Sequence, residues 1–355
     1  MTKNNTLKCP NCDGKISFSI QSTNLQCEYC GETIELKNTD DNDFAIEEHD
    51  FAFFAEKFTK SSENIIEKII DCTACSAQIV LEGNDLIEDC PYCGTAVTQT
   101  FHEQNALKPQ YMLPFQIARE DAREKFRQWQ KSLWFAPNSF KEERLLNKLN
   151  GVFMPFFTFD ISVHSRYTGQ RGENYTEHYT DSEGNSHTRT KTRWYSAYGV
   201  VYNFFNDVLI YCSKTFQRKF VEELEPWDLE NLEKFDADKL RGFDGETYSI
   251  DLYESFDNAE DAIDDAIKNS IRRDIGGDKQ RIHSYCNSYN DIAFKYLILP
   301  VWVSNIKFKN KDYRFYINAR TGEVQGERPY SALKITLAIL LLVAIIGTLV
   351  LVFSK

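Results

Sequence analysis

The chain has 355 residues, a net charge of −12 and an aromatic content of 14%. This length accommodates roughly two to three domains, and the abundance of Phe and Tyr favours β-structure. The acidic charge is confined to residues 1–105, which carry 7 Lys and Arg against 19 Asp and Glu, whereas the remainder carries 34 of each sign. Because nucleic-acid binding needs a basic surface to neutralise phosphates, this distribution argues against DNA or RNA as the ligand of the N-terminal segment.

A cysteine pattern occurs twice in this acidic segment. Each copy consists of two Cys-x2-Cys pairs separated by fourteen residues, and a glycine follows the second pair. Two such pairs at the ends of a short hairpin bring four thiolates around one tetrahedral zinc ion. We therefore expect two zinc ribbons, at residues 1–37 and 65–101, each holding one structural Zn²⁺. The expected ligands are Cys9, Cys12, Cys27 and Cys30 in the first ribbon and Cys72, Cys75, Cys90 and Cys93 in the second.

Disulfides and a rubredoxin-type iron site are the alternative interpretations of these eight cysteines. The chain shows no N-terminal signal peptide, and two identically spaced sets favour zinc in a reducing cytosol. A four-thiolate site has no open coordination position, so the expected role of the metal is structural and not catalytic. The remaining cysteines, Cys212 and Cys286, lie in apolar, strand-like surroundings, and we expect both to be buried.

The two ribbons are separated by an acidic segment at residues 38–64, which we expect to be a linker. An aromatic run from Phe51 to Phe58 interrupts it and predicts a short helix or strand that docks on the rest of the protein.

Residues 102–331 predict an α+β body rich in antiparallel sheet. Apolar residues recur at helical spacing from Ala118 to Leu133, and shorter helices are expected at 142–149 and 215–224. A long strand begins near Phe153 and reaches Thr180, and a return strand covers 187–211. Pro155 predicts a bulge or a sheet edge.

Acidic and basic residues face each other across this hairpin. The outgoing strand carries Glu173, Glu177 and Asp181, and the return strand carries Arg189, Lys191 and Arg193. Two registers are considered, one pairing Asp181 with Arg189 and Glu177 with Arg193, the other pairing Glu177 with Lys191. Either register predicts cross-strand ion pairs, which we prefer to a basic stripe for lipid or RNA.

The second half of the body repeats this order of elements. A strand at 247–252, an amphipathic helix over 259–271 and strands at 280–287 and 294–308 are expected. Gly276 and Gly277 predict a helix C-cap, since they follow a helix instead of opening one as a phosphate loop does. The sequence around Pro155 is similar to that around Pro300, at an offset of 145 residues. This similarity predicts two related units, residues 106–212 and 243–330.

The C-terminal end carries nineteen uncharged residues, from Ile335 to Phe353, bracketed by Lys334 and Lys355. At 1.5 Å per residue such a helix is about 28 Å long, which matches the hydrocarbon thickness of a bilayer. We expect a tail anchor at 332–354, in contact with the lipid bilayer through 333–353. Basic residues precede the span and predict that the large N-terminal part lies in the cytoplasm.

The chain resembles an uncharacterised bacterial family of twin zinc-ribbon proteins with an α+β body and a C-terminal transmembrane segment, whose members are often labelled primosomal replication helicase. The residues that carry this resemblance are Leu113–Phe115, Gly151–Asp160, Tyr167–Gly172, Glu225–Asp228, Arg273–Asp278, Phe294–Lys295, Leu299–Trp302 and Asn318–Ser331. The family implies this architecture but no activity. The chain has no Walker A sequence, so we reject the helicase label.

Three functions are compatible with these features. The favoured one is a membrane-anchored, non-enzymatic interaction or scaffold module whose acidic ribbons bind a protein partner. The alternatives are nucleic-acid binding through the ribbons and an enzyme of unknown type in the body. The polar candidates for an enzyme are Asp160, His164, Arg273, Asp274 and Asp278, although no nucleophile–base spacing or cofactor motif supports a reaction.

Overall fold

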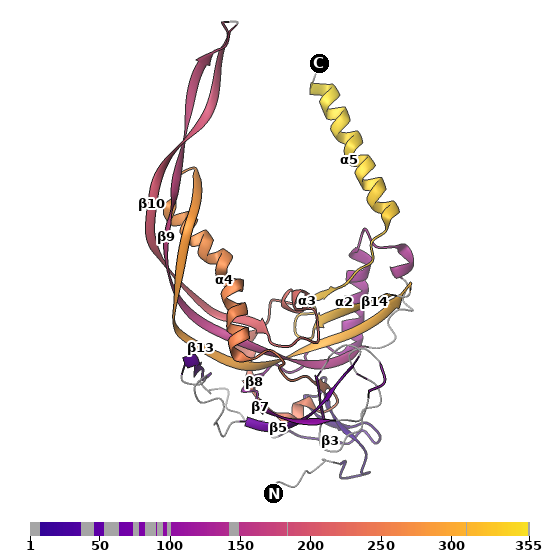
Figure 1. The fold of residues 1–355 in the computed structure, drawn as a ribbon. Coiled ribbons are helices and arrows are strands. Elements are labelled where there is room, and N and C mark those ends of the chain that lie inside the picture. Colours follow the sequence, from indigo (N-terminus) through magenta and orange to yellow (C-terminus); the bar gives the residue numbers. More distant parts are fainter. Residues whose placement is uncertain are drawn as a thin grey trace.

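The computed structural model describes residues 8–36, 46–52, 64–73, 78–81, 90, 95–97, 101–141, 149–182, 184–309 and 311–353. These residues form an α+β body built around one large sheet, with the N-terminal cysteine segments at its base (Figure 1). Two long projections rise from the same side of the body: a β-hairpin arm and the C-terminal helix α5, Ala332–Phe353 (Figure 1). The predicted sheet-rich α+β class is thus observed.

Two very long antiparallel strands form the centre of the sheet. They are β9, Asn150–Thr180, and β13, Lys279–Phe308, paired from Asn150 opposite Val303 to Gly172 opposite Lys279. β10, Ser186–Tyr211, flanks β9, and β14, Lys311–Asn318, flanks β13, followed by β15, Val324–Gly326. The sheet order β10-β9-β13-β14-β15 therefore places the two hairpins on opposite sides of one central pair.

Shorter elements complete the sheet and cover it. Four strands of two residues each also join the sheet. They are β4, His49–Asp50; β8, Tyr111–Met112; β11, Glu233–Lys234; and β12, Asp244–Gly245. The helices are α2, Arg119–Ser132, α3, Arg218–Glu222, and α4, Leu252–Ile275, with 3₁₀ turns η2, Asn138–Lys141, η4, Leu229–Asn231, and η5, Ala237–Leu240. The predicted helix over 142–149 lies outside the described residues except for its last position.

Pro155 lies inside β9, yet the β9–β13 register is continuous there and shows no bulge. The Pro155 carbonyl accepts a hydrogen bond from the Cys212 amide, and β10 ends one residue earlier, at Tyr211. The amide and the carbonyl of one strand residue point toward the same neighbouring strand. The amide hydrogen that Pro155 lacks would therefore point toward β10, which has already ended at this position. The proline is therefore tolerated at a local edge, which was one of the two predicted situations.

Pro155 and Pro300 lie at matching places on the central strand pair, since Pro155 lies opposite Ile298 and Pro300 lies opposite Phe153. The two short parallel strands also pair at corresponding places, because Gly245 lies opposite Phe153 and Met112 lies opposite Ile298, although Met112 and Gly245 are 133 residues apart and not 145. Each of these short strands is followed, after the same interval, by an α-helix, α2 or α4. The two halves of the body are thus arranged alike around the central strand pair.

The arm consists of β9, β10 and the first half of β13, with α4 packed along one face (Figure 1). The buried side of α4 carries Ala259, Ile263, Ile267 and Ile271, as the periodicity predicts. The strand expected at 247–252 is wrong: the side chain of Asp251 accepts the amide of Glu254, and this cap starts α4 at Leu252. Gly276, with φ of 65°, ends the helix, which confirms the predicted C-cap.

Two further sequence predictions need correction. The strands expected at 280–287 and 294–308 are one strand, β13, because an irregularity between Asn290 and Ala293 absorbs the polar residues without ending the ladder. The helix expected at 215–224 is a single short turn, α3.

Cross-strand ion pairs are present on the hairpin, but in a different register. Arg189 lies directly opposite Glu177, and Lys191 reaches the same carboxylate diagonally, at 2.5 and 2.8 Å respectively. Asp181 pairs with His187 at 2.7 Å and not with Arg189. The predicted Glu177–Lys191 ion pair is thus observed. The strand register differs by two residues from the alternative that pairs Glu177 with Lys191 and by four from the alternative that pairs Asp181 with Arg189.

Candidate metal centre

The first ribbon is a three-stranded sheet with a cysteine turn at either end. Its strands are β1, Ile16–Ser19, β2, Asn24–Cys27, and β3, Thr33–Ile34. The two turns are built alike: the amide of Cys9 donates to Gly14 and that of Cys27 donates to Glu32. Asp13 and Gly31 occupy the equivalent left-handed positions, with φ of 56° and 75°. The glycine after the second pair therefore serves the conformation expected of it.

These turns bring four sulfurs together. The Sγ atoms of Cys9, Cys12, Cys27 and Cys30 all lie within 4.8 Å of one another. The Cys9–Cys30 and Cys12–Cys27 pairs are each 3.5 Å apart, close to the edge of about 3.8 Å in a tetrahedron with Zn–S bonds of about 2.3 Å. Four thiols with this spacing fit a zinc ion. When bound, the metal would close the two turns on each other and contribute folding energy to a ribbon with a very small apolar core.

The thiols differ in acidity because their surroundings differ. Amide hydrogen bonds, the largest from Cys30, lower the pKa of Cys27 to about 6, although burial opposes them. Burial raises the pKa of Cys9. Cys27 is therefore more readily ionised than Cys9 before the metal arrives, and zinc binding has to displace the proton of Cys9.

The second cysteine set is described in part. Cys72 and Cys90 are both buried, at 2% and 1% exposure, and they belong to one apolar cluster with Ile79. The amide of Cys90 donates to Thr95 at 2.8 Å, the same five-residue bond as in both turns of the first ribbon. β5, Asn64–Asp71, pairs with β6, Gln78–Leu81, and with β7, His102–Leu107. Cys75 and Cys93 lie outside the described residues, so the second zinc site stays a prediction.

Both cysteine segments are docked on the body. In the first, the amide of Phe18 donates to the Arg241 carbonyl at 2.9 Å, and the ring of Phe243 packs against both the ribbon core and the body core. In the second, Ile79 forms a β-bridge with Glu246. The segment from Arg241 to Glu246 therefore touches both cysteine segments and links them to the sheet through β12.

Residues 46–52, inside the expected linker, also pack on the body. His49 and Asp50 pair with β13, and the ring of Phe51 lies among Phe159, Phe256 and Phe294. This contact agrees with the predicted docking of the aromatic run, of which residues 53–58 are not described.

A buried lysine fastens this segment. Lys295, whose side chain is 5% exposed, contacts Glu48 and Asp207, each at 2.6 Å. Burial lowers the pKa of Lys295, but the two carboxylates outweigh it and the pKa is raised overall. Asp160 lies within 4.8 Å of both carboxylates and accepts the Asp207 amide at 2.8 Å, and burial raises its pKa. Sequence reasoning missed this cluster, since Lys295 stood out only within the Phe294–Lys295 resemblance and Glu48 is 247 residues away.

The structure gives the candidate enzyme residues separate partners. His164 packs edge-on against Tyr202, with ring centroids 4.6 Å apart. The Tyr167 hydroxyl donates to Asp274 at 2.5 Å, and the Asn174 amide donates to Asp278 at 2.7 Å. Arg273 donates to the Ser270 hydroxyl at 3.0 Å. Each of these contacts holds the arm or α4 in place, and among the described residues they do not converge on one reactive centre.

The two remaining cysteines differ from each other. Cys212 is fully buried, as predicted, and burial raises the pKa of its thiol. The prediction for Cys286 is wrong, because this side chain is exposed. Cys286 lies on the arm opposite Arg166, on the sheet face away from α4.

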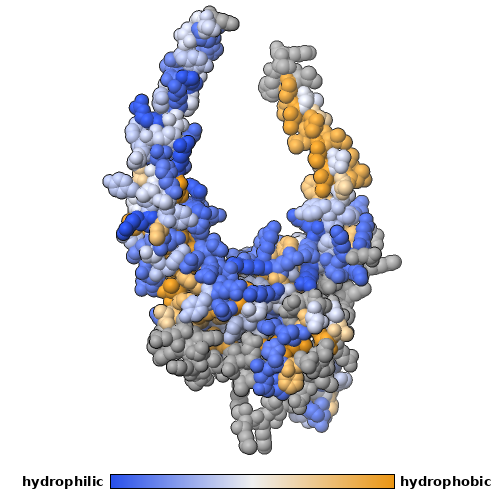
Figure 2. Space-filling view, in the orientation of Figure 1, coloured by the Kyte–Doolittle hydropathy of each residue, from blue (hydrophilic) through white to orange (hydrophobic). Residues whose placement is uncertain are grey.

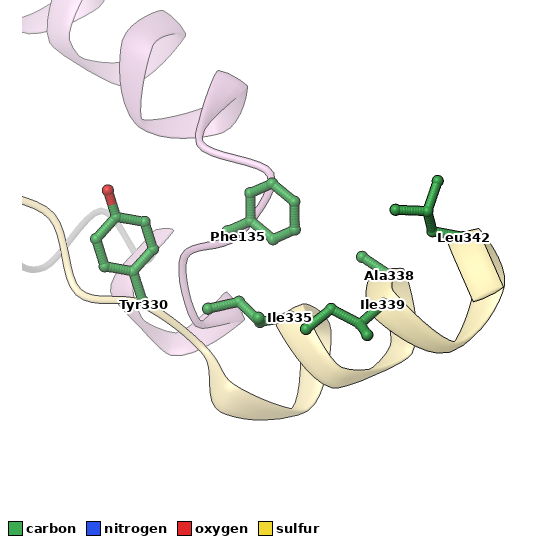
Figure 3. Close-up of a pocket in the computed structure, with 6 residues that line it drawn as sticks. All are labelled: Phe135, Tyr330, Ile335, Ala338, Ile339 and Leu342. Carbon is green, nitrogen blue, oxygen red and sulfur yellow. The ribbon is translucent and has the colours of Figure 1, made fainter.

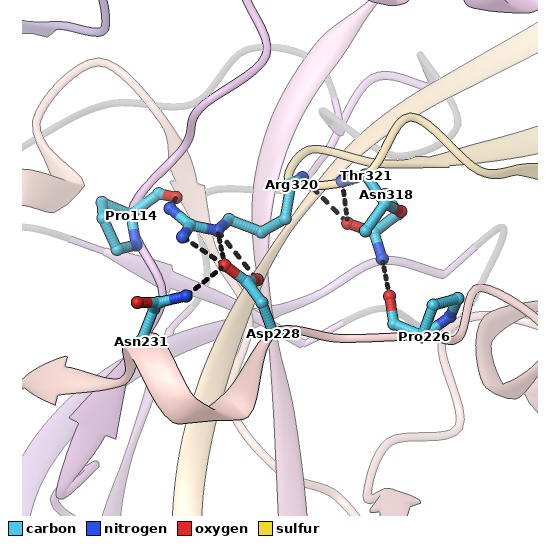
Figure 4. A network of polar contacts seen from close by, with 7 residues as sticks. All are labelled: Pro114, Pro226, Asp228, Asn231, Asn318, Arg320 and Thr321. Carbon is cyan, nitrogen blue, oxygen red and sulfur yellow. Dashed lines mark hydrogen bonds and ion pairs between the residues drawn. The ribbon is translucent and has the colours of Figure 1, made fainter.

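Several segments that carry the family resemblance meet in one polar network (Figure 4). The Arg320 guanidinium binds the Asp228 carboxylate, with Nε at 3.0 Å, and donates to the Pro114 carbonyl at 3.1 Å. The side-chain Nδ2 of Asn318 donates to the Leu224 and Pro226 carbonyls. Although burial would raise the pKa of Asp228, Arg320 holds it below its usual value. These residues lock the β14–β15 turn to the body, so they serve the architecture.

The predicted membrane segment is a helix. Ala332–Val350 has a mean hydropathy of 2.6 and none of it is buried by the rest of the chain. Its surface is the largest continuous apolar surface in Figure 2, beside a hydrophilic arm. By length and composition this helix can cross a bilayer, whereas the direction of crossing stays a prediction.

Comparisons with known proteins add one relative. The chain is similar to the uncharacterised protein YdjG of Bacillus subtilis (strain 168), with 24% identity over 334 residues that span 92% of this chain and 91% of YdjG. No family model and no solved structure matches the chain. The similarity covers nearly the whole length of both proteins and names no activity for either.

Proposed function

We propose that this protein is a membrane-anchored, non-enzymatic scaffold whose zinc-ribbon head binds a protein partner at the cytoplasmic membrane face. The observation that carries the proposal is the combination of a closed four-thiol site with an apolar helix left uncovered by the chain. A closed thiolate site organises a surface instead of activating a substrate. The apolar helix supplies the membrane attachment.

The head presents a surface suited to protein contact. Tyr29, between two of the zinc ligands, is 79% exposed, and the neighbouring Glu28 and Glu32 are exposed as well. An exposed aromatic ring surrounded by carboxylates favours a partner with an apolar pocket and a basic rim. The same carboxylates repel nucleic-acid phosphates, which is why nucleic-acid binding ranks second.

The body supplies the rigid support for this head. Both ribbons contact the segment from Arg241 to Glu246, and we propose that residues 106–212 and 243–330 are two copies of one unit whose symmetric pairing builds that support. A head fixed to the sheet has a defined direction relative to the anchor, so a bound partner is held at a defined place on the membrane.

The proposal is tested by capturing partners of the full-length protein from solubilised membranes. The Tyr29→Ala, Glu28→Lys and Glu32→Lys changes are combined in one chain, because none of them replaces a zinc ligand. We expect the partner to be lost while zinc content and membrane association are kept. Arg189→Ala on the distant arm is the matched control and should retain the partner.

Two results would contradict the proposal. Equal capture by the head variant and the wild type would remove the head as the binding surface. Salt-dependent retention of DNA or RNA by the full chain, lost when Cys9 and Cys12 are both replaced by Ser, would favour the nucleic-acid alternative.

A further inference from the structure

Three aromatic side chains stand exposed where α5 leaves the body. Trp134 is 75% exposed, Phe135 is 40% exposed and Tyr330 is 60% exposed. They come from two segments far apart in the sequence, the loop after α2 and the residues that lead into α5. Figure 3 shows Phe135 and Tyr330 from these two segments. These side chains adjoin the uncovered apolar surface of α5, and an exposed apolar patch of this kind marks a contact.

The loop and the base of α5 are joined by hydrogen bonds. The Ser331 amide donates to the Phe135 carbonyl at 2.8 Å. The Lys334 ammonium donates to the Ala136 carbonyl and to the Asn138 side chain, both at 2.8 Å. Three bonds at one place hold the aromatic loop against the first turn of the helix, so the loop stays at the level where the helix enters a membrane.

A shallow cavity of about 360 Å³, wide open to the outside, lies between the loop and the helix (Figure 3). Its lining is almost entirely apolar and consists of Phe135, Tyr330, Ile335, Ala338, Ile339 and Leu342. Four of these residues belong to the helix that is long and apolar enough to span a bilayer. The cavity is therefore continuous with the surface that hydrocarbon would cover, and its volume falls in the range of small-molecule sites.

We infer that Trp134, Phe135 and Tyr330 form an interfacial collar that enters the headgroup region of the bilayer, and that the cavity takes an acyl chain of a phospholipid from that leaflet. This inference rests on the proposed membrane anchoring. Trp and Tyr prefer the membrane–water boundary, where their rings contact hydrocarbon and their polar atoms stay hydrated. Phe135, which carries no polar atom, lines the cavity itself.

Cations at the collar fit the phosphate of such a lipid. Arg328 donates to the Tyr330 hydroxyl at 3.1 Å, and its guanidinium lies 5.7 Å from the centre of that ring. Lys334 donates to two uncharged oxygens, so these two contacts do not neutralise its positive charge. A second copy of α5 could also cover an apolar cavity, but it would supply no anion for these two cations. We therefore assign the site to phospholipid.

The experiment uses the full-length protein in phosphatidylcholine–phosphatidylglycerol vesicles that contain lipids brominated near the headgroup. The chain has five tryptophans, and bromine quenches only those that approach the lipid. Trp134→Phe removes the collar tryptophan, and Trp194→Phe, which removes a half-buried tryptophan on the arm, is the matched control. We expect quenching in the wild type and in Trp194→Phe, and at least a twofold loss of quenching in Trp134→Phe.

A second variant tests the cavity. Phe135→Trp in the Trp134→Phe background should restore quenching, with a maximum for bromine placed deeper along the acyl chain. Unchanged quenching in Trp134→Phe would overturn the inference, and so would failure of Phe135→Trp to restore quenching. Cross-linking of two α5 helices through position 338, together with an absence of quenching, would also overturn it.

Extraction with alkaline carbonate separates this inference from the anchoring on which it rests. Protein that stays in the membrane pellet but shows no quenching contradicts the collar alone. Protein that carbonate releases contradicts the anchor itself.

Discussion

Pro155 and Pro300 occupy matching positions on neighbouring antiparallel strands. The Pro155 carbonyl accepts the Cys212 amide at 3.2 Å, and the Pro300 carbonyl accepts the Ala319 amide at 3.0 Å. In both cases the donor is the first residue after the return strand, β10 or β14. Each proline therefore stands where its return strand has ended, and the same solution is used twice in one sheet.

The metal centre yields the first prediction. Full-length protein purified without chelator should contain two Zn²⁺ per chain, and a chain with Cys9→Ser and Cys12→Ser should contain one, because two ligands cannot close a structural site. Zinc released by a thiol-blocking reagent and measured with a colorimetric chelator gives the count. Cys286→Ser is the matched control and should keep both ions. One ion in the wild type would show that the second cysteine set does not bind zinc.

The Arg320–Asp228 pair yields the second prediction. Arg320→Ala leaves a half-buried carboxylate without its partner and should destabilise the body by roughly 3 kcal/mol, while Arg320→Lys should recover only part of the loss. Arg189→Ala, which breaks an exposed pair, should cost less than about 1 kcal/mol. Thermal unfolding in detergent compares the three variants.

The pH dependence of this effect has a definite sign. The folded protein holds the pKa of Asp228 below its ordinary value of 3.8, so the pair contributes stability above that value and loses it as the pH falls. The difference between wild type and Arg320→Ala should shrink in acid. A difference that stays constant from pH 7 to pH 3 would exclude the ionised pair as its source.

Asp244 yields the third prediction, with the opposite sign. Burial raises the pKa of Asp244 from 3.8 to about 6, although Lys15 opposes the shift. The folded state binds this proton more tightly than the unfolded state, so ionised Asp244 costs stability as the pH rises from about 4 to about 6, and the full cost remains above pH 6. Asp244→Asn should raise the melting temperature by about 2 to 4 °C at pH 7.5 and change nothing at pH 3.5. Destabilisation at pH 7.5 would contradict this account.

Lys295 yields the fourth prediction. Lys295→Met removes the cation between Glu48 and Asp207, and the remaining carboxylates then repel one another. Hydrogen exchange over residues 46–52 should accelerate at least tenfold, since this segment loses its ion pair to β13. Lys311→Met, on an exposed position of β14, serves as the control. Equal exchange in both variants would show that Phe51 alone holds the segment.

The arm and α5 yield the fifth prediction. Both rise from the same side of the body (Figure 1), and the upper part of the arm is hydrophilic (Figure 2). Hydrocarbon does not accept such strands, so the two projections must diverge when α5 spans a bilayer. Fluorophores placed at Thr188 and Val350 by unnatural amino acids should lose energy transfer on passing from detergent to nanodiscs. Unchanged or increased transfer would contradict a spanning α5.

Local patterns in the sequence predicted the elements that depend on neighbouring residues. The cysteine spacing predicted the first thiol cluster, the apolar periodicity predicted α2 and α4, and the uncharged run predicted α5. The offset of 145 residues related Pro155 to Pro300, and these two prolines occupy matching positions on β9 and β13.

Features that depend on distant contacts were not predictable in this way. The register of the arm differs by two residues because the turn, and not the charges, sets it. The burial of Lys295 depends on Glu48 and Asp207, which the fold brings from other segments. Cys286 is exposed because α4 covers only the other face of the arm, and strand-like sequence alone does not reveal which face is covered.

The binding of a protein by the zinc-ribbon head is tested most directly by photocross-linking in intact cells. A photoreactive amino acid replaces Tyr29, or Thr188 on the arm as a control, in the full-length chain. The account predicts a discrete membrane-associated protein cross-linked from position 29 and absent from position 188 and from the Cys9→Ser, Cys12→Ser chain. Cross-linking from position 29 to RNA, or an identical pattern from both positions, would contradict it.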